Sequence, residues 1–328
     1  MRTTRYRYLL LSLTVVMLLC STTSCISFGA GWFMTGYSLK PGGNKAARDT
    51  AFSWRNVRQD KTTAAWLDSL NSVGALRDTF ITCKEKPKYR LHAWYVKASR
   101  PTAATIVVVH GYTNSGITMM PYARMFSHDM GYNVLVPDLR YAGLSDGNHI
   151  QMGWRDRLDV EQWIDILPTI FGDSIQVAVH GVSMGAATVM MLSGDELPSY
   201  VKALIEDCGY TSVWAEFKKE LKTQFHLPPF PLMYTANTVC RMRYGWSFKK
   251  ANAVEQLKKS TLPMLFIHGT ADTFVPYTML DELYAAKPNN KWRWDAPNAA
   301  HAETFWKYRK EYAQRVRKFI EEHIGSCL

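Results

Sequence analysis

Residues 177–191 read VAVHGVSMGAATVMM, a run that begins like a buried strand and continues in residues that favour a helix. Ser183 falls at the junction, with Gly181 and Gly185 two residues away on either side. A tight turn holds its central residue in a strained conformation and leaves no room for side chains on its flanks. The pattern is typical of a nucleophile elbow, in which one serine is exposed between a strand and a helix. The alternative is an ordinary turn serine.

The rest of the chain predicts an α/β fold of one large domain. Two strands at 79–83 and 89–97 form an antiparallel entry to the sheet, and short apolar strands alternate with helices after them. This alternation implies right-handed crossovers and a mainly parallel central sheet flanked by helices. The further strands are predicted at 105–109, 133–136, 175–179, 202–205, 264–267 and 291–294, and the helices at 119–130, 154–167, 186–193, 278–286 and 303–323.

One stretch, residues 212–257, interrupts this alternation. It lies between two regular β-α units and carries prolines at 228, 229 and 231. It also carries several large aromatic residues, among them Trp214, Phe217, Phe225, Phe230, Tyr234 and Trp246. We interpret it as a small helical cap inserted into the domain. Its aromatic side chains either roof a pocket or pack into a core.

A serine hydroxyl is a poor nucleophile at neutral pH, so it needs a base and a third group that orients the base. The segment LPMLFIHGTADTFVP places Asp272 in a loop after a strand, and WDAPNAAHAETF places His301 in a loop before the last helix. These two residues are the predicted partners of Ser183. Asp207, which also ends a strand, is the alternative acid.

The order Ser183, Asp272, His301 is the order of the triad in α/β-hydrolases, and the chain resembles that family over residues 78–323. The resemblance extends to VVVHGYTNSG and to VPDLRYAGLSDG, where Tyr141 and Ala142 stand in place of the usual Gly and His. The segments GWRDRLDVEQWI and IEDCGYTS are similar to those of exported and membrane-associated serine hydrolases of the BEM46-like group. The family pattern implies that the backbone N–H groups of Tyr112 and Met184 form the oxyanion hole.

The expected function is a serine hydrolase that cleaves carboxylic esters through an acyl-enzyme on Ser183. The alternatives are a serine peptidase acting on short peptides, and a non-catalytic envelope binding protein that kept the fold. No acidic pair for binding an amine is evident in the sequence. There is also no phosphate-binding glycine loop or metal-binding motif, so we expect no cofactor and no metal.

The first residues have the features of an export signal. Three arginines precede an apolar run from Tyr8 to Cys20, and small residues then lead to Cys25. Thr22-Thr23-Ser24-Cys25 resembles a bacterial lipoprotein box, so residues 1–24 are the expected signal peptide and Cys25 the lipid attachment site. Residues 25–77 are interpreted as a tether and N-terminal extension, with a polar tether over 38–50. The expected location is the cell envelope, anchored by lipid in a membrane, and plain secretion is the alternative.

The net charge limits the classes of binding partner that the sequence predicts, and the cysteines leave their pairing open. The net charge of +11 falls to +8 without residues 1–24, which hold three arginines and no acid. The lysines are spread along predicted helices without a pattern of stacking aromatics, which favours a solvated surface over a nucleic-acid groove. An acidic membrane surface is compatible with this charge. Four cysteines remain in the mature body, and their pairing is left open: Cys83, Cys208, Cys240 and Cys327.

Overall fold

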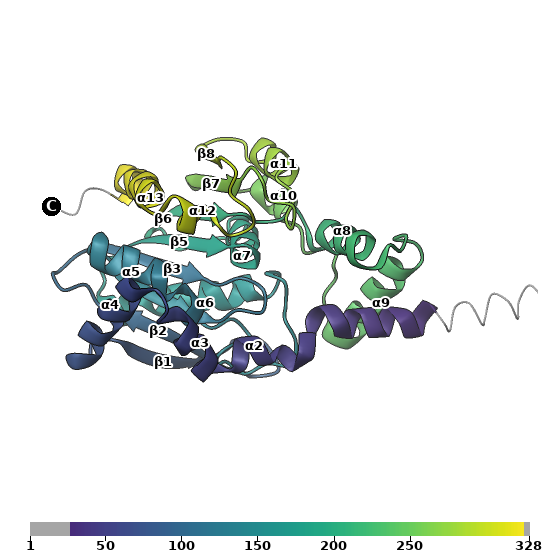
Figure 1. The fold of residues 1–328 in the computed structure, drawn as a ribbon, viewed down its shortest axis with the longest axis horizontal. Coiled ribbons are helices and arrows are strands. Elements are labelled where there is room, and N and C mark those ends of the chain that lie inside the picture. Colours follow the sequence, from purple (N-terminus) through teal and green to yellow (C-terminus); the bar gives the residue numbers. More distant parts are fainter. Residues whose placement is uncertain (1–26, 325–328) are drawn as a thin grey trace, which may run out of the picture.

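A computed structural model describes residues 27–324, which form a single twisted sheet with helices on both faces (Figure 1). The eight strands lie in the order β1-β2-β4-β3-β5-β6-β7-β8. β1 and β2 pair antiparallel with their neighbours, and all other strands are parallel. The strands are β1 (Arg77–Thr82), β2 (Arg90–Val96), β3 (Ala104–Val109), β4 (Asn133–Pro137), β5 (Gln176–Val182), β6 (Val201–Asp207), β7 (Met264–Gly269) and β8 (Lys291–Ala296). The predicted α/β-hydrolase fold with its mainly parallel sheet is confirmed.

The sheet separates two hydrophobic cores, because successive side chains of a strand point to opposite faces. In β3, Val107 and Val109 belong to one core, while Ile106 and Val108 belong to the other. All six residues of this strand are buried, as a strand covered on both faces requires. The predicted antiparallel entry and each predicted strand are found, within a few residues at their ends.

The helices follow the predicted alternation, but the helix predicted at 119–130 consists of short 3₁₀, α and π segments. The helix predicted at 303–323 is divided at Tyr308 into a short helix and a long one. Beyond a helix at residues 27–39, the helical elements are η1 (Pro41–Asn44), α2 (Lys45–Arg48), α3 (Thr50–Val57), α4 (Lys61–Ser72), η2 (Gly116–Met119), α5 (Met120–Arg124), η3 (Met125–Asp129), α6 (Asp156–Phe171), α7 (Met184–Leu192), α8 (Val213–Phe225), α9 (Leu232–Tyr244), α10 (Ala253–Leu257), α11 (Thr278–Ala286), α12 (Thr304–Lys307) and α13 (Arg309–Ile324).

The prediction of a polar tether over residues 38–50 was wrong, because this segment is folded onto the domain. Leu39, Asn44 and Ala47 are almost fully buried. The carbonyl of Leu39 accepts a hydrogen bond from the N–H of Ile150, and that of Ala47 accepts one from Gly143. These bonds join the segment to the 141–150 loop, in which the sequence departs from the family pattern, so the N-terminal segment covers this altered loop.

The predicted cap at residues 212–257 divides into two parts. α8 and α9 project beyond the end of the sheet, and the helix of residues 27–39, purple in Figure 1, runs beside α9. α10 instead packs against α7 and α11 in the body of the domain. The projecting cap therefore consists of α8 and α9 together with a helix from the other end of the chain.

Two further expectations concern the termini and the cysteines. The predicted signal peptide and Cys25 lie outside the described residues, as does Cys327. Cys83, Cys208 and Cys240 are buried free thiols. Within residues 27–324, no helix combines the length and the apolar character needed to cross a bilayer.

The strand-to-helix junction around Ser183 leaves no space for side chains beside it. A Cβ atom at Gly185 would lie 2.2 Å from the carbonyl oxygen of Val109 in β3, and one at Gly181 would lie 2.2 Å from that of Gly185. Such distances are far inside van der Waals contact, and the opposing atoms are backbone. The two glycines are therefore required by close packing of β5, α7 and β3.

This packing predicts that Gly185→Ala lowers the free energy of unfolding by at least about 2 kcal/mol, since the backbone of β3 must move. Gly36→Ala makes the same chemical change in the helix of residues 27–39, where a Cβ would meet no atom within 4 Å. That substitution should stabilise by up to about 1 kcal/mol through helix propensity. Urea unfolding followed by circular dichroism measures both. Equal midpoints for the two variants would contradict the close approach at Gly185.

Candidate functional site

Ser183 stands at the carboxyl end of β5, in the residue that precedes α7. Its φ is 58° and its ψ is −115°, a backbone conformation that L-residues rarely adopt. Its N–H donates to the carbonyl of Asp207 at 2.8 Å, which fixes the turn to the neighbouring strand β6. The side chain makes no capping bond to α7, so its hydroxyl is available for another partner.

The structure brings His301 between Ser183 and Asp272. The Nε2 atom of His301 lies 2.8 Å from the Oγ atom of Ser183, and its Nδ1 atom lies 2.7 Å from Oδ2 of Asp272. Asp272 is buried in the loop after β7, and His301 follows β8 and is partly exposed. With Nδ1 donating to the carboxylate, Nε2 is left to accept the serine proton.

Asp207, the alternative acid, is held by a different residue. Its Oδ2 accepts a hydrogen bond of 2.9 Å from the hydroxyl of Tyr312 in α13. Burial raises the pKa of this carboxyl to about 6, although the bond from Tyr312 opposes the shift. The same Tyr312 hydroxyl lies 2.7 Å from Nε2 of His180. Asp207 thus belongs to a buried network beneath the junction and not to the contact with His301.

Asp272 is surrounded by hydrogen-bond donors. Its Oδ1 accepts the backbone N–H groups of Phe274 and Val275, each at 2.9 Å. A second imidazole, that of His268, places Nε2 3.2 Å from Oδ2. Burial alone would raise the pKa of Asp272, but the bonds from His268 and His301 outweigh it and lower the pKa to about 2. The carboxyl group is therefore ionised near neutral pH.

His268 is a site residue that the sequence analysis did not identify. It is fully buried at the end of β7, and its Nε2 also lies 3.0 Å from the carbonyl of Val275. Because both neighbours of Nε2 are acceptors, this nitrogen carries a proton. The sequence holds one signal for it, since His268 stands four residues before Asp272 in the same strand-end segment.

The two predicted oxyanion donors lie beside Ser183. Met184 is the first residue of α7, so its N–H is one of the helix amides without an intrahelical acceptor. Tyr112 follows Gly111, where a Cβ would stand 3.5 Å from that of Ser183. Tyr112 and Met184 line the same pocket as the serine. The Tyr112 hydroxyl donates to the carbonyl of Ser38 at 2.7 Å, which ties this loop to the N-terminal helix.

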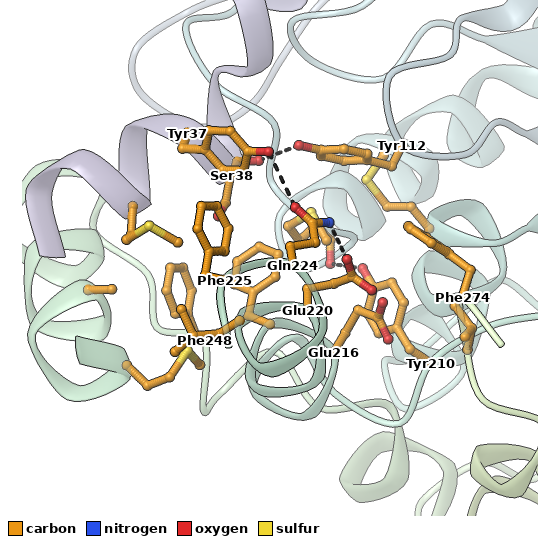
Figure 2. A pocket seen from close by; sticks show the side chains of 18 of the residues that line it. Tyr37, Ser38, Tyr112, Tyr210, Glu216, Glu220, Gln224, Phe225, Phe248 and Phe274 are labelled. Atoms are coloured by element: carbon orange, nitrogen blue, oxygen red, sulfur yellow. Dashed lines mark hydrogen bonds between the residues drawn. The ribbon is translucent and has the colours of Figure 1, made fainter. Parts of the chain in front are cut away.

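A largely apolar pocket opens onto Ser183 beneath the cap (Figure 2). α8 supplies Phe217, Leu221 and Phe225, and α9 supplies Met233 and Ala236. The aromatic residues of the cap therefore do roof a pocket in part: Phe217 and Phe225 line it, whereas Trp214 and Trp246 are absent from its lining.

The helix of residues 27–39 forms another wall of this pocket, which the sequence analysis missed. Met34, Tyr37 and Ser38 face it. The hydroxyl of Thr35 is shared between two carbonyl groups, that of Gly31 in its own helix at 2.7 Å and that of Ala236 in α9 at 3.1 Å. A Cβ at Gly31 would lie 2.8 Å from the nitrogen of Ala236, so the two helices are in close contact.

Two carboxyl groups also face the pocket, Glu216 and Glu220 of α8 (Figure 2). The sequence analysis found no acidic pair. A signal for it exists in the segment EFKKE, because residues four apart lie on one face of a helix. It was missed because the lysines between them indicated a solvated helix.

Among residues 27–324, Cys208, Asp272 and His301 bring potential metal-binding atoms within 4.8 Å of one another. Two of these atoms belong to groups already paired with each other. Burial raises the pKa of the Cys208 thiol well above its usual value, so the thiolate that binds metals best is disfavoured. We assign no metal and no cofactor to this cluster.

Known proteins resemble this chain in sequence. A family model described as the α/β hydrolase fold matches residues 104–237. YqkD of Bacillus subtilis strain 168 is 28% identical over 259 residues, covering 79% of this chain and 84% of YqkD. The lysophosphatidylserine lipase ABHD12 of Danio rerio is 24% identical over 209 residues, which are 60% of this chain and 51% of the lipase. The match therefore spans about half of the lipase.

Solved structures share the fold. The esterase Pf2001 of Pyrococcus furiosus superposes with a TM-score of 0.63 at 22% identity, covering 78% of this chain and 94% of the esterase. An acylaminoacyl peptidase of Pyrococcus horikoshii does so with a TM-score of 0.56 at 17% identity, over 77% of this chain and 43% of the peptidase. The finer likeness to the BEM46-like group stays a prediction. With this sheet and a family model that matches residues 104–237, the chain has the α/β-hydrolase fold.

Proposed function

We propose that the protein is a serine hydrolase that cleaves carboxylic esters through an acyl-enzyme on Ser183. The observation that carries the proposal is the position of His301, whose two ring nitrogens lie within hydrogen-bond distance of Ser183 and Asp272. This arrangement supplies a nucleophile, a base and an orienting acid. Hydrolase activity is also supported by the fold and by relatives named as an esterase and a lipase.

In the proposed reaction, His301 takes the proton of Ser183 as Oγ attacks the ester carbonyl carbon. The N–H groups of Met184 and Tyr112 stabilise the oxyanion, and one such donor contributes roughly 3 to 4 kcal/mol in comparable sites. The imidazolium then protonates the leaving alkoxide as the tetrahedral intermediate collapses. A water molecule, deprotonated by His301, hydrolyses the acyl-enzyme and restores Ser183.

The pocket favours esters with an apolar acyl group. Its walls from α8, α9 and the helix of residues 27–39 are mostly aliphatic and aromatic, so an acyl chain exchanges water for apolar contacts there. Peptidase activity on short peptides is the alternative use of the same three side chains. Parallel assays with p-nitrophenyl esters and peptide p-nitroanilides would separate the two.

Ser183→Ala tests the nucleophile. Turnover of short p-nitrophenyl esters should fall by at least about 10³-fold, because the attacking oxygen is gone. Labelling by a fluorophosphonate probe should disappear. The melting temperature should stay nearly unchanged, since this side chain caps no helix. Labelling that persists in the variant at wild-type level would refute the assignment of Ser183.

The two buried carboxylates provide a matched test of the acid. Asp272→Asn should lower kcat by roughly 10³ to 10⁴-fold, because an amide no longer holds His301 in the required tautomer. Asp207→Asn, which disturbs the bond from Tyr312, should mainly lower stability. Steady-state kinetics and thermal unfolding of both variants measure this. A larger loss of kcat in a folded Asp207→Asn protein would show that the acid is Asp207.

We also propose that the mature chain begins at Cys25 and is anchored by lipid in the cell envelope, where it meets its esters. The support is the sequence alone: a basic start, an apolar run and small residues before the cysteine. Several acyl chains on one cysteine would anchor firmly, because each buried methylene contributes about 0.8 kcal/mol.

Cys25→Ser should release the protein from membranes or leave it unprocessed, without changing esterase activity in detergent. Cys20→Ser is the matched control, because it makes the same change within the predicted signal peptide and should leave anchoring intact. Membrane fractionation and intact-mass measurement read the result. If the wild-type protein carries no lipid and fractionates as freely soluble, the lipid anchor is refuted and plain secretion is the better hypothesis.

A further inference from the structure

Two carboxyl groups of α8 face the pocket that opens onto Ser183. Glu216 and Glu220 are one helical turn apart, and both line this pocket (Figure 2). They are surrounded by apolar side chains of the same helix, among them Phe217 and Leu221. Acidic side chains are uncommon in such a setting unless they are paired. Their partners therefore decide what the pocket can bind.

Glu220 has its partners within α8. The ammonium group of Lys219 contacts its Oε1, and the amide nitrogen of Gln224 donates to its Oε2. Lys219 also donates to the carbonyl of Phe274 in the loop that carries Asp272. The single positive charge of Lys219 is thus engaged by Glu220, and both oxygens of Glu220 are hydrogen-bonded.

Glu216, in contrast, has no hydrogen-bonded partner among the described residues. Its residue is 4% exposed, and neither carboxylate oxygen accepts a hydrogen bond from any residue in the described part of the chain. Lys219 forms a long ion pair with it, because its Nζ lies 3.8 Å from Oε1, which is beyond hydrogen-bond distance. Burial raises the pKa of this carboxyl to about 8, with Glu220 and Asp272 adding to the shift and Lys219 opposing it. A buried carboxyl group without a partner is costly, so a ligand that supplies donors and positive charge would be favoured there.

A primary ammonium group meets both requirements. It has three donors, enough for both oxygens of Glu216, and its positive charge would stabilise the ionised form of this carboxyl, which burial disfavours in the free protein. A hydroxyl group brings a single donor and no charge. The remaining walls of the pocket are apolar, so the cation must be carried on a hydrocarbon frame.

We propose that Glu216 binds an ammonium group on the acyl part of the substrate, so that the enzyme prefers amino-bearing esters to neutral esters of the same size. This rests on the proposed function, in which Ser183 forms the acyl-enzyme and the pocket beneath the cap holds the acyl group. Glu220 acts by holding Lys219 away from Glu216. The preferred class is aminoacyl esters with an apolar chain.

The test compares paired p-nitrophenyl esters at about pH 7 on the full chain. Leucine is paired with 4-methylpentanoic acid, and 6-aminohexanoic acid with heptanoic acid, in which a methyl group replaces the ammonium. In the wild type, kcat/KM for at least one amino ester should exceed that of its neutral partner by about tenfold or more, as for a charge-assisted hydrogen bond. The ratio does not depend on how much of each preparation is active.

Glu216→Gln removes the ionisable carboxyl group with little change of shape, and it should lower that ratio by about tenfold. Glu220→Gln should lower it too, because Lys219 is then free to approach Glu216. Glu321→Gln, an exposed residue of α13, makes the same change far from the pocket and should leave the ratio as in the wild type. If Glu216→Gln fails to fold, competitive inhibition of the wild type supplies the measurement: hexylamine should inhibit heptanoate ester turnover at about tenfold lower concentration than 1-hexanol.

The outcomes separate this inference from the proposed function. Ratios near one for both pairs in the wild type, a ratio that survives in Glu216→Gln, or equal inhibition by hexylamine and 1-hexanol would overturn ammonium binding while leaving the serine hydrolase in place. If none of the esters is turned over and the fluorophosphonate probe does not label Ser183, the proposed hydrolase function itself is refuted.

Discussion

The site depends on the close approach of three backbone segments at the carboxyl ends of the parallel strands. β5 runs between β3 and β6, and its final turn fits against β3 only because Gly181 and Gly185 have no side chains. Ser183 is thereby held at positive φ, with its N–H bonded to the end of β6. The loops after β7 and β8 follow along the same edge and carry Asp272 and His301. Ser183, Asp272 and His301 thus follow β5, β7 and β8 in turn, and the parallel strands bring them to the same end of the sheet.

Two buried aspartates at this edge show how surroundings assign different roles to one residue type. Burial acts on both, and it disfavours their charged forms. At Asp207 one phenol donor is not enough to reverse the effect, and the pKa of the carboxyl is raised to about 6. At Asp272 the hydrogen bonds from two imidazoles, those of His268 and His301, reverse it, and the pKa falls to about 2. A permanently ionised carboxylate is the one suited to orient an imidazole.

The alternation of strands and helices, the elbow at Ser183 and its partnership with Asp272 and His301 were predictable from the sequence, because each leaves a local pattern. The folding of residues 38–50 was not, since its polar and glycine-rich composition favours a loop. What orders it is hydrogen bonds to Gly143 and Ile150, and no periodicity records such distant contacts. Glu216 was hidden for a related reason. Its helix has lysines on one side and a pocket on the other, and only the tertiary structure shows which side faces inward.

The pocket wall joins two helices that are far apart in the chain: Thr35 and Ala236, which meet by a hydrogen bond, are 201 residues apart in sequence. Neither of these two helices carries Ser183, Asp272 or His301. Changes along this seam alter the shape of the acyl pocket without touching the chemistry beneath it. The width of the pocket is therefore set by contacts between the two ends of the chain, and the positions of Ser183, Asp272 and His301 are set by the sheet.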